Sequence, residues 1–401
     1  MKIYEKLKFY NQEHLLNFYK ELNFIEKILL KKQINKIDFE KINNLYKNSF
    51  YDEELDINKI SNLNCIYKLK NNEIKKYNKI GEELIKNKKY GIVIMAGGNA
   101  SRLDLDIPKG CLKLNINNKK ISIFEIYINQ LKNIYEKYNV YIPLYIMTSS
   151  YNYKNTKKFF KDNNYFKYPK DKIVFFKQNN LPILDINGKI LLKNKYNILF
   201  GPNGNGDVFN SLKYNNLIKK MKKNNLEYIL FSTIDNVLTN LIDFKFIGST
   251  IYNNYNLATK TILKNDENDK NWVFCKYDNK PYMIPSRYLN NDINNKKDNN
   301  NNFVYRDKNI TYHLININEI IKYSNIKLKY HRAFKKNNYM NNNGEFIIAD
   351  KQNTFKFEKF IFDAFEYSND MLLYRIDEKE FCTIKNKEDI KKAENILNKV
   401  K

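Results

Sequence analysis

The sequence predicts an α/β fold with a mostly parallel mixed sheet. From residue 91 onward, short apolar runs alternate with longer amphipathic runs, and the apolar ones are GIVIMA (91–96), IPLYIMTSS (142–150), KIVFFKQ (172–178) and EYILFSTID (227–235). The runs between them include SIFEIYINQLKNIYEKY (122–138) and VFNSLKYNNLIKKM (208–221). Strands that alternate with helices are typical of parallel βαβ units, whose sheet is covered by helices on both faces.

We expect three consecutive segments along the 401 residues. Residues 1–88 form a helical N-terminal segment, residues 89–330 a central sheet domain, and residues 331–401 a small C-terminal region that completes the site. In the first segment we expect a helix capped by Asn11, because apolar residues follow it at helical spacing: Leu15, Phe18, Tyr19 and Leu22. The polar run at residues 290–302 is expected to be a surface loop.

The chain carries an excess of positive charge that we attribute to its composition. Lysine and arginine number 70 against 44 acidic residues, which gives a formal charge of +26. Only five of these cations are arginines, and the lysines are scattered among asparagines along the whole chain. Nucleic-acid-binding proteins usually concentrate their charge and favour the bidentate arginine side chain. We therefore expect a solvated surface and no specific nucleic-acid partner.

Cysteine spacing and hydropathy favour a cytoplasmic protein. The four cysteines form no CxxC pair, so neither a zinc site nor a disulfide framework is expected. No run of 18 apolar residues occurs, and no membrane partner is expected. The residues also show no Ser/His/Asp or Cys/His arrangement for nucleophilic catalysis, and we expect structural roles for the three histidines: His14, His313 and His331.

The stretch GIVIMAGGNASRLDLDIPKG, residues 91–110, joins an apolar strand to a glycine-rich turn. Gly97 and Gly98 follow the strand at the sheet edge where α/β folds bind ligands, and adjacent glycines let backbone N–H groups approach an anion. The pattern is neither GxxxxGK[ST] nor GxGxxG, which disfavours a Walker-type ATPase and a standard dinucleotide-binding dehydrogenase. Arg102 and Lys109 flank the loop, and two cations beside donor amides suit a triphosphate.

The pattern AGGxx[ST]RL followed by PKG resembles the signature loop of nucleotide-sugar pyrophosphorylases, in particular the eukaryotic UDP-N-acetylglucosamine pyrophosphorylase family. Further stretches resemble this family in the same order and cover nearly the whole chain: NQEHLLNFYKEL, LYIMTSS, FFKQNNLPILDINGKILL, GPNGNGDVF, STIDNVLTNLIDFKFIG, FEKFIFDAF and EFCTIKN. The resemblance implies a Rossmann-like nucleotidyltransferase core. It also implies that UTP and N-acetylglucosamine 1-phosphate are converted, with Mg²⁺, to UDP-N-acetylglucosamine and pyrophosphate.

The resemblance assigns roles on the nucleotide side. Gln178 in FFKQNNLP would read the uracil, while the uridine would meet backbone at two glycine-rich loops: Gly97 and Gly98, then Gly204 and Asn205. The phosphates would contact three catalytic cations: Arg102, Lys109 and Lys385. From the residues alone, Gln178 could instead close a strand, an Asn-Gly pair is a common turn, and Lys385 is one of many surface lysines.

The resemblance also assigns a metal ligand and a sugar side. Asp235 ends an apolar strand, and its hard oxygen ligands would suit Mg²⁺ shared with phosphate oxygens, although an aspartate there could equally cap the next element. Phe360 and Phe362 in EKFIFD would line the sugar, although the F-x-F pattern also fits a core strand.

Departures from the family pattern fall mainly on the sugar side. The nucleotide loop changes mildly, with Ala100 for glycine, Ser101 for threonine and Asp104 for glycine. On the sugar side the changes are larger: Trp272 for glycine, Ser286 for glutamate and Tyr312 for asparagine. Two added rings and a lost carboxylate would remove hydrogen bonds that discriminate between sugars. The favoured interpretation is synthesis of UDP-N-acetylglucosamine with a rebuilt sugar pocket, and the alternatives are another sugar 1-phosphate or UTP binding without turnover.

Overall fold

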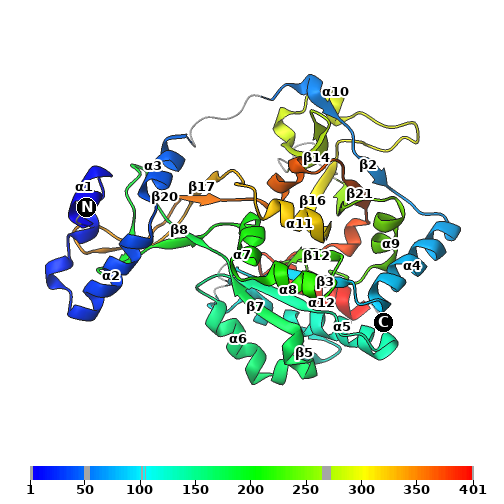
Figure 1. Ribbon diagram of the computed structural model, residues 1–401, viewed down its shortest axis with the longest axis horizontal. Coiled ribbons are helices and arrows are strands. Elements are labelled where there is room, and N and C mark those ends of the chain that lie inside the picture. Colours follow the sequence, from blue (N-terminus) through cyan, green and yellow to red (C-terminus); the bar gives the residue numbers. More distant parts are fainter. Residues whose placement is uncertain (1–2, 49–54, 101–102, 104, 264–271, 400–401) are drawn as a thin grey trace. The chain divides into compact units, whose positions relative to one another are not determined.

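The computed structural model describes residues 3–48, 55–100, 103, 105–263 and 272–399. The chain forms two compact units, and Figure 1 shows the helices and strands that make them up. The first unit contains Met1–Glu54, Asn179–Asp207 and Leu328–Phe360, and the second contains Leu55–Gln178, Val208–Lys327 and Ile361–Lys401. The three consecutive segments expected from the sequence do not coincide with these units, because each unit combines stretches that are far apart in the chain.

A large mixed sheet forms the centre of the second unit, with the strand order β2-β21-β13-β16-β12-β3-β6-β7. The four strands predicted from apolar runs are neighbours at one end of this order and run parallel: β12 (Tyr228–Thr233), β3 (Tyr90–Met95), β6 (Leu144–Thr148) and β7 (Ile173–Lys177). These runs are apolar throughout because helices bury both faces of a parallel sheet. The predicted α/β fold with a mostly parallel mixed sheet is confirmed.

The rest of this sheet contains both pairing directions. β16 (Asp307–Asn316) runs antiparallel to β12 and to β13 (Leu257–Leu263), and the strands beyond β13 are parallel again: β21 (Leu372–Arg375) and β2 (Asn64–Ile66). An antiparallel branch adds β14 (Trp272–Tyr277), β15 (Lys280–Pro285) and β1 (Ile60–Ser61). β4 (Lys113–Ile116) and β5 (Lys119–Ser122) form a separate hairpin.

The helix α5 (Ile123–Tyr138) illustrates how the sequence forms the covering layer. Ser122 Oγ accepts a hydrogen bond from the backbone N–H of Glu125 at the start, and Asn139 ends the helix in the left-handed conformation. The side chains at helical spacing are buried: Ile123, Phe124, Tyr127, Ile128, Leu131 and Ile134. The other α-helices of this unit are α4 (Asn71–Lys86), α6 (Tyr153–Asp162), α7 (Val208–Tyr214), α8 (Leu217–Lys223), α9 (Phe244–Tyr252), α10 (Asn291–Asn294), α11 (Ile317–Tyr323) and α12 (Lys387–Lys399).

The first unit has an apolar core of its own. Its helices are α1 (Ile3–Phe9), α2 (Phe24–Lys36) and α3 (Phe39–Asn48). Its strands are β8 (Asn180–Pro182), β9 (Leu192–Asn194), β10 (Asn197–Ile198), β11 (Phe200–Pro202), β17 (His331–Lys335), β18 (Tyr339–Met340), β19 (Phe346–Ile347) and β20 (Thr354–Glu358). Leu30, Ile34, Leu184 and Phe357 are among the buried side chains that all three stretches contribute.

The prediction of one helix capped by Asn11 is wrong in the type of helix and in its cap. Two short 3-10 helices, η1 (Glu13–Leu16) and η2 (Tyr19–Glu21), replace a continuous α-helix. Gln12 rather than Asn11 precedes η1, and its side chain bonds to Gly188 O (3.1 Å) and Ile190 N (2.8 Å) instead of capping the helix. The apolar spacing therefore identified buried residues, namely Leu15, Phe18 and Leu22, but tertiary hydrogen bonds changed the local helix.

Two further expectations concern a surface loop and membrane-spanning helices. The polar run at residues 290–302 is largely exposed and includes the short helix α10. Within the residues that the structure describes, no helix is both long enough and apolar enough to cross a membrane.

Candidate active site

The carboxyl ends of four parallel strands lie at one edge of the large sheet. Met95 pairs in register with Met147 and Thr233, and Thr148 pairs with Lys177. Residues within two positions of these strand ends therefore share that edge: Gly97, Ser149, Gln178 and Asp235. This edge is where ligands bind in open α/β folds.

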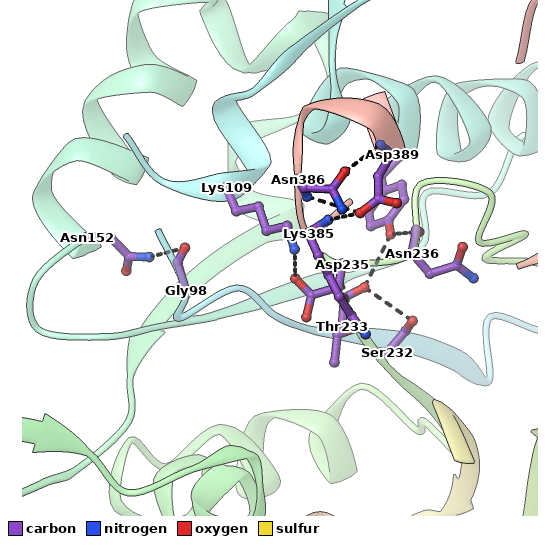
Figure 2. A network of polar contacts seen from close by, with 11 residues as sticks. Gly98, Lys109, Asn152, Ser232, Thr233, Asp235, Asn236, Lys385, Asn386 and Asp389 are labelled. Atoms are coloured by element: carbon purple, nitrogen blue, oxygen red, sulfur yellow. Dashed lines mark hydrogen bonds and ion pairs between the residues drawn. The ribbon is translucent and has the colours of Figure 1, made fainter. Parts of the chain in front are cut away.

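The first glycine loop is shaped by a close contact with Gln178. A Cβ atom added at Gly97 would lie 2.2 Å from Gln178 Nε2, so a larger residue there would displace the glutamine amide from its place across the loop. A Cβ atom at the exposed Gly98 would meet nothing within 4 Å. The buried side chain of Asn152 donates to Ala96 O (2.9 Å) and Gly98 O (3.2 Å), as Figure 2 shows for the second bond. A side chain from the next βα connection thus holds the residues on either side of Gly97.

Backbone hydrogen bonds close this loop and place Lys109 at its end. Ala100 N donates to Ile107 O (2.9 Å), and Lys109 N donates to Gly98 O (3.2 Å). A Cβ atom at Gly110 would lie 2.3 Å from the Phe124 ring, so the chain after Lys109 passes directly over α5. Arg102, which the sequence assigns to the phosphates, lies outside the described residues, as do Ser101 and Asp104.

The loop brings Lys109 to the end of β12. Its ammonium Nζ forms an ion pair with Asp235 Oδ1, and Figure 2 shows the two side chains facing each other. The Lys109 side chain is only 13% exposed, whereas that of Asp235 is 47% exposed. The carboxylate is thus open to a further ligand while the lysine is held in place.

Lys385 lies beside the same aspartate because its segment pairs with the chain after β12. Three hydrogen bonds join them, from Val237 N to Cys382 O (3.1 Å), from Cys382 N to Asn236 Oδ1 (3.0 Å) and from Ile384 N to Asp235 O (3.3 Å). Asp389 Oδ2 accepts the backbone N–H of Lys385 (2.7 Å) at the start of α12, while the Lys385 side chain is exposed. The structure therefore brings three predicted residues together, namely Lys109, Asp235 and Lys385 (Figure 2).

Gln178 carries a buried acceptor that is unsatisfied. Gln178 is 7% exposed, and its backbone N–H donates to Thr148 O (2.9 Å). Its Oε1 atom is buried and has no hydrogen-bond partner among the described residues. Because leaving a buried polar atom unpaired costs roughly 1–3 kcal/mol, such an atom at a strand end indicates a place where a ligand group or a water binds.

The second glycine loop belongs to the first unit. Gly204 has φ +87°, and a Cβ atom there would lie 2.4 Å from Lys359 O, so the position requires glycine. Asn205 begins the short helix η8 (Asn205–Asp207) and is partly exposed. Phe360 belongs to this unit too, with its ring centroid 4.7 Å from that of His331.

Three of the predicted sugar-side residues lie near one another in the second unit. The rings of Trp272 and Phe362 have centroids 5.3 Å apart, and both side chains are partly exposed. Trp272 is opposite Pro285 in the β14–β15 pair, and Ser286 follows directly as the start of η9 (Ser286–Tyr288). These residues form a second, aromatic group of candidate residues.

Tyr312 is placed differently from that group. It is 3% exposed within the main apolar core, and its hydroxyl donates to Asn240 O (2.5 Å). Lys260 Nζ lies 4.7 Å from the centroid of its ring. Since both the ring and the hydroxyl are already engaged in the interior, we do not retain the sugar-side role predicted for Tyr312.

Two site asparagines were missed by the sequence reasoning. Asn152 holds the first glycine loop, and Asn236 holds both the Lys385 segment and, through its carbonyl, the hydroxyl of Tyr127 (2.7 Å). Both are buried. An asparagine in a buried position is the signal that could have found them. Asparagine occurs throughout this sequence, so these two residues do not stand out.

Among the residues that the structure describes at this site, the half-exposed Asp235 could meet a metal ion. The part of the chain that the structure describes contains no group of three or more His, Cys, Asp or Glu side chains able to hold a metal. Mg²⁺ commonly binds through one or two carboxylates together with substrate phosphates and water. The half-exposed Asp235 fits that arrangement, in which the nucleotide supplies most of the ligands.

Comparisons with known proteins show the family to which the chain belongs. A family model described as UTP–glucose-1-phosphate uridylyltransferase matches residues 16–398. The UDP-N-acetylglucosamine pyrophosphorylase of Saccharomyces cerevisiae is 31% identical over 322 residues, covering 77% of this chain and 67% of the yeast protein. The UDP-N-acetylglucosamine diphosphorylase 2 of Arabidopsis thaliana is 28% identical over 405 residues, covering 95% of this chain and 79% of that protein.

A solved structure supports the fold independently. The uridine diphosphate N-acetylglucosamine pyrophosphorylase of Trypanosoma brucei, solved with an inhibitor, superposes with a TM-score of 0.79 at 23% identity, covering 97% of this chain and 83% of that one. The resemblance seen in the sequence is confirmed, and the chain belongs to the UTP–glucose-1-phosphate uridylyltransferase family.

Proposed function

We propose that this protein transfers a uridylyl group from UTP to N-acetylglucosamine 1-phosphate, giving UDP-N-acetylglucosamine and pyrophosphate. The observation that supports this most is that Gln178 and Asp235 share a sheet edge, and that Lys109 forms an ion pair with Asp235, in a member of this family. The relatives from yeast and Arabidopsis carry the N-acetylglucosamine name.

The chemistry requires positioning and charge stabilisation rather than a covalent enzyme intermediate. A phosphate oxygen of the sugar 1-phosphate attacks the α-phosphorus of UTP, a new P–O bond forms, and the bond to the departing pyrophosphate breaks. Lys109 and Lys385 are the described cations available to the phosphates, and Arg102 is proposed as a third. Their charge opposes the negative charge that builds up on the transferring and leaving groups.

Gln178 would select the base. Uracil presents an imide edge with both an N–H donor and carbonyl acceptors, and an amide side chain can pair with such an edge. The unpartnered Oε1 atom is free for the imide N–H. The space beside Gly97 and Gly98 would accommodate the nucleoside without a clash with a side chain.

Asp235 would hold Mg²⁺ together with the phosphates. The ion would neutralise phosphate charge and orient the leaving pyrophosphate. In the free protein the Lys109 ammonium occupies one carboxylate oxygen, so phosphate binding to Lys109 would leave Asp235 more available to the ion. We place the reaction in the cytoplasm, since the four cysteines are free and three of them are buried.

A second candidate function is the use of another sugar 1-phosphate. The observation that favours it is the Trp272–Phe362 pair next to Ser286, which offers rings and a hydroxyl where the resemblance implies a glycine and a glutamate. Hydrogen-bonding side chains discriminate between sugars far more strongly than apolar surfaces do. The choice of sugar 1-phosphate therefore depends on these side chains.

The test is pyrophosphate release from UTP with a panel of sugar 1-phosphates that includes N-acetylglucosamine, N-acetylgalactosamine, glucose and galactose forms. The proposal expects the fastest turnover with N-acetylglucosamine 1-phosphate, lost when Mg²⁺ is chelated. Faster turnover with a different sugar would select the second candidate. UTP binding without turnover on any sugar would contradict both.

A further inference from the structure

Asn152 stands at the start of a helix without capping it. It occupies the N-cap position of α6, where an asparagine side chain normally accepts a backbone N–H of the first turn and stabilises the helix. The Asn152 side chain makes no such bond, although the residue is 1% exposed and its amide therefore needs partners within the protein. The proposed chemistry does not use this residue either. Its side chain must therefore serve a contact other than the helix.

Both ends of the Asn152 amide are engaged near the sheet edge. Its Oδ1 atom accepts from Ser149 N (3.0 Å) and Ser149 Oγ (3.1 Å) at the end of β6. Its Nδ2 atom donates to Ala96 O (2.9 Å) and to Gly98 O (3.2 Å), the second of which Figure 2 shows. β6 lies between β3, which leads into the first glycine loop, and β7, which leads to Gln178. The amide therefore ties the glycine loop to the middle strand of the three.

The end of β6 also holds the residue that we propose reads uracil. Gln178 N donates to Thr148 O (2.9 Å), and Thr148 Oγ1 donates to Phe176 O (3.0 Å) on β7. A Cβ atom added at Gly97 would lie 2.2 Å from Gln178 Nε2 and 3.4 Å from Ser149 N. The loop, the strand end and the glutamine amide are thus in direct contact. A small shift of the loop would therefore move the Gln178 amide.

The Asn152 amide also orients two peptide groups of the loop. The carbonyls of Ala96 and Gly98 both face Asn152. None of the described peptide bonds is cis, so each N–H points away from the C=O of its own peptide. The N–H groups of the same two peptides, those of Gly97 and Asn99, therefore face the opposite side, and no described residue accepts a hydrogen bond from either. Two backbone donors placed in this way suit the oxygen atoms of a nucleotide.

We infer that Asn152 is a positioning residue for nucleotide binding, which fixes the first glycine loop so that the loop and the Gln178 amide contact UTP together. The inference rests on the proposed function, and the residues that carry it all belong to the second unit. Asn152→Asp keeps the size of the side chain and the acceptor for Ser149, but it replaces the NH₂ donor with an oxygen that faces two carbonyls. Even a protonated carboxyl would donate to only one of them. We expect the Kd for UTP to rise by about tenfold or more.

The experiment on the full chain combines calorimetry of UTP binding with steady-state kinetics in which UTP and N-acetylglucosamine 1-phosphate are varied in turn. The variants are Asn152→Asp, Asn152→Ala and the matched control Asn155→Asp, which makes the same change at an exposed position of α6. We expect Kd and KM for UTP to rise in both Asn152 variants, while KM for the sugar 1-phosphate is unchanged and the control behaves as the wild type. If Asn152→Asp does not fold, Asn152→Ala carries the test.

A double-mutant cycle with Gly97→Ala separates positioning from a merely structural role. Gly97→Ala displaces the Gln178 amide directly. If Asn152 acts through the same loop, adding Asn152→Asp to Gly97→Ala should raise the Kd for UTP by a clearly smaller factor than adding it to the wild type. Two factors that simply multiply would show that the two residues act independently.

The outcomes separate this inference from the proposed function. A wild-type chain that does not bind UTP would overturn both. If the wild type binds UTP without turnover, the proposed function fails, while calorimetry and the double-mutant cycle still decide the inference. Asn152 variants that keep the wild-type affinity for UTP would overturn the inference alone. Equal rises in KM for both substrates, or independent factors in the cycle, would also overturn it, since they would indicate a merely structural side chain.

Discussion

The two halves of the candidate site in the second unit are built by different means. The nucleotide-side loop is fixed by backbone hydrogen bonds and by glycines whose Cβ positions are occupied, as at Gly97 and Gly110. The sugar side depends on side chains, with Trp272 and Phe362 in ring contact and Ser286 beside them. A Cβ atom added at Gly97 or Gly110 would meet the side chain of Gln178 or Phe124, whereas a substitution of Trp272 changes a partly exposed ring contact. Substrate choice can therefore change on the sugar side while the transfer chemistry is kept.

The largest effect is expected on the nucleotide side, from loss of the Lys109 ammonium. Lys109→Ala should lower kcat/KM by about a hundredfold to a thousandfold, because a preorganised charge toward the phosphates is removed. The exposed Lys113→Ala is the matched control and should retain wild-type turnover. Both variants should melt close to the wild type, and wild-type rates for Lys109→Ala would remove Lys109 from the mechanism.

The next prediction separates two neighbouring glycines. In Gly97→Ala, the new Cβ would displace the Gln178 amide, so UTP affinity should fall by about tenfold to a hundredfold with little change in melting temperature. Gly98→Ala should be milder, since the space at its Cβ is open in the free protein. Calorimetric UTP binding checks the pair. Equal affinity of Gly97→Ala and the wild type would break the proposed link between the loop and Gln178.

A substitution on the sugar side should affect the other substrate. Trp272→Ala removes the ring that packs on Phe362, and we expect KM for the sugar 1-phosphate to rise by about threefold to tenfold while KM for UTP is unchanged. Steady-state kinetics with each substrate varied in turn measures the two KM values separately. An equal rise in both KM values would contradict a division of the site into two separately built halves.

The smallest effect concerns a buried histidine beneath the sugar side. His313 on β16 packs its ring on Phe365 of η10 (Ile361–Tyr367), the short helix that carries Phe362, with centroids 4.9 Å apart. Burial lowers the pKa of His313 from 6.5 to about 3. The unfolded chain therefore takes up a proton near pH 6.5 that the folded chain refuses, so stability is fully present above that pH and is lost as pH falls toward 3.

The expected loss from His313 between pH 7.5 and 5.5 is about 1.4 kcal/mol of unfolding free energy. Denaturant unfolding at the two pH values measures this loss of unfolding free energy. In His313→Leu the unfolding free energy should differ less between the two pH values. Part of the slope should remain, because burial also lowers the pKa of His14. An unchanged slope in His313→Leu would show that the imidazole is protonated in the folded protein.

Much of the fold could be predicted because the parallel strands are continuous apolar runs. Gly97 and Asp235 were each predicted to follow a strand end, and the structure places both of them, with Gln178, at one edge of the sheet. The ion pair between Lys109 and Asp235 agrees with the shared site inferred from the resemblance. The local sequence pattern was sufficient to predict a site residue wherever a strand end and a short loop determine the position of that residue.

What could not be predicted depends on long-range contacts. The first unit draws on three distant stretches, which no local change of composition reveals. Tyr312 looks the same in sequence whether it lines a pocket or, as here, donates its hydroxyl to Asn240 within the core. Asp207 follows a turn that looks ordinary in the sequence, although its buried carboxylate accepts the backbone N–H of Asn179, 28 residues away.

We propose above all that uracil pairs with the Gln178 amide while the phosphates contact Lys109. A crystal structure of the chain with UTP and Mg²⁺ tests this most directly. We predict the uracil imide edge at about 2.7–3.2 Å from the Gln178 amide, with phosphate oxygens on Lys109 and the ion beside Asp235. A base bound away from Gln178, or phosphates out of reach of Lys109, would contradict the account.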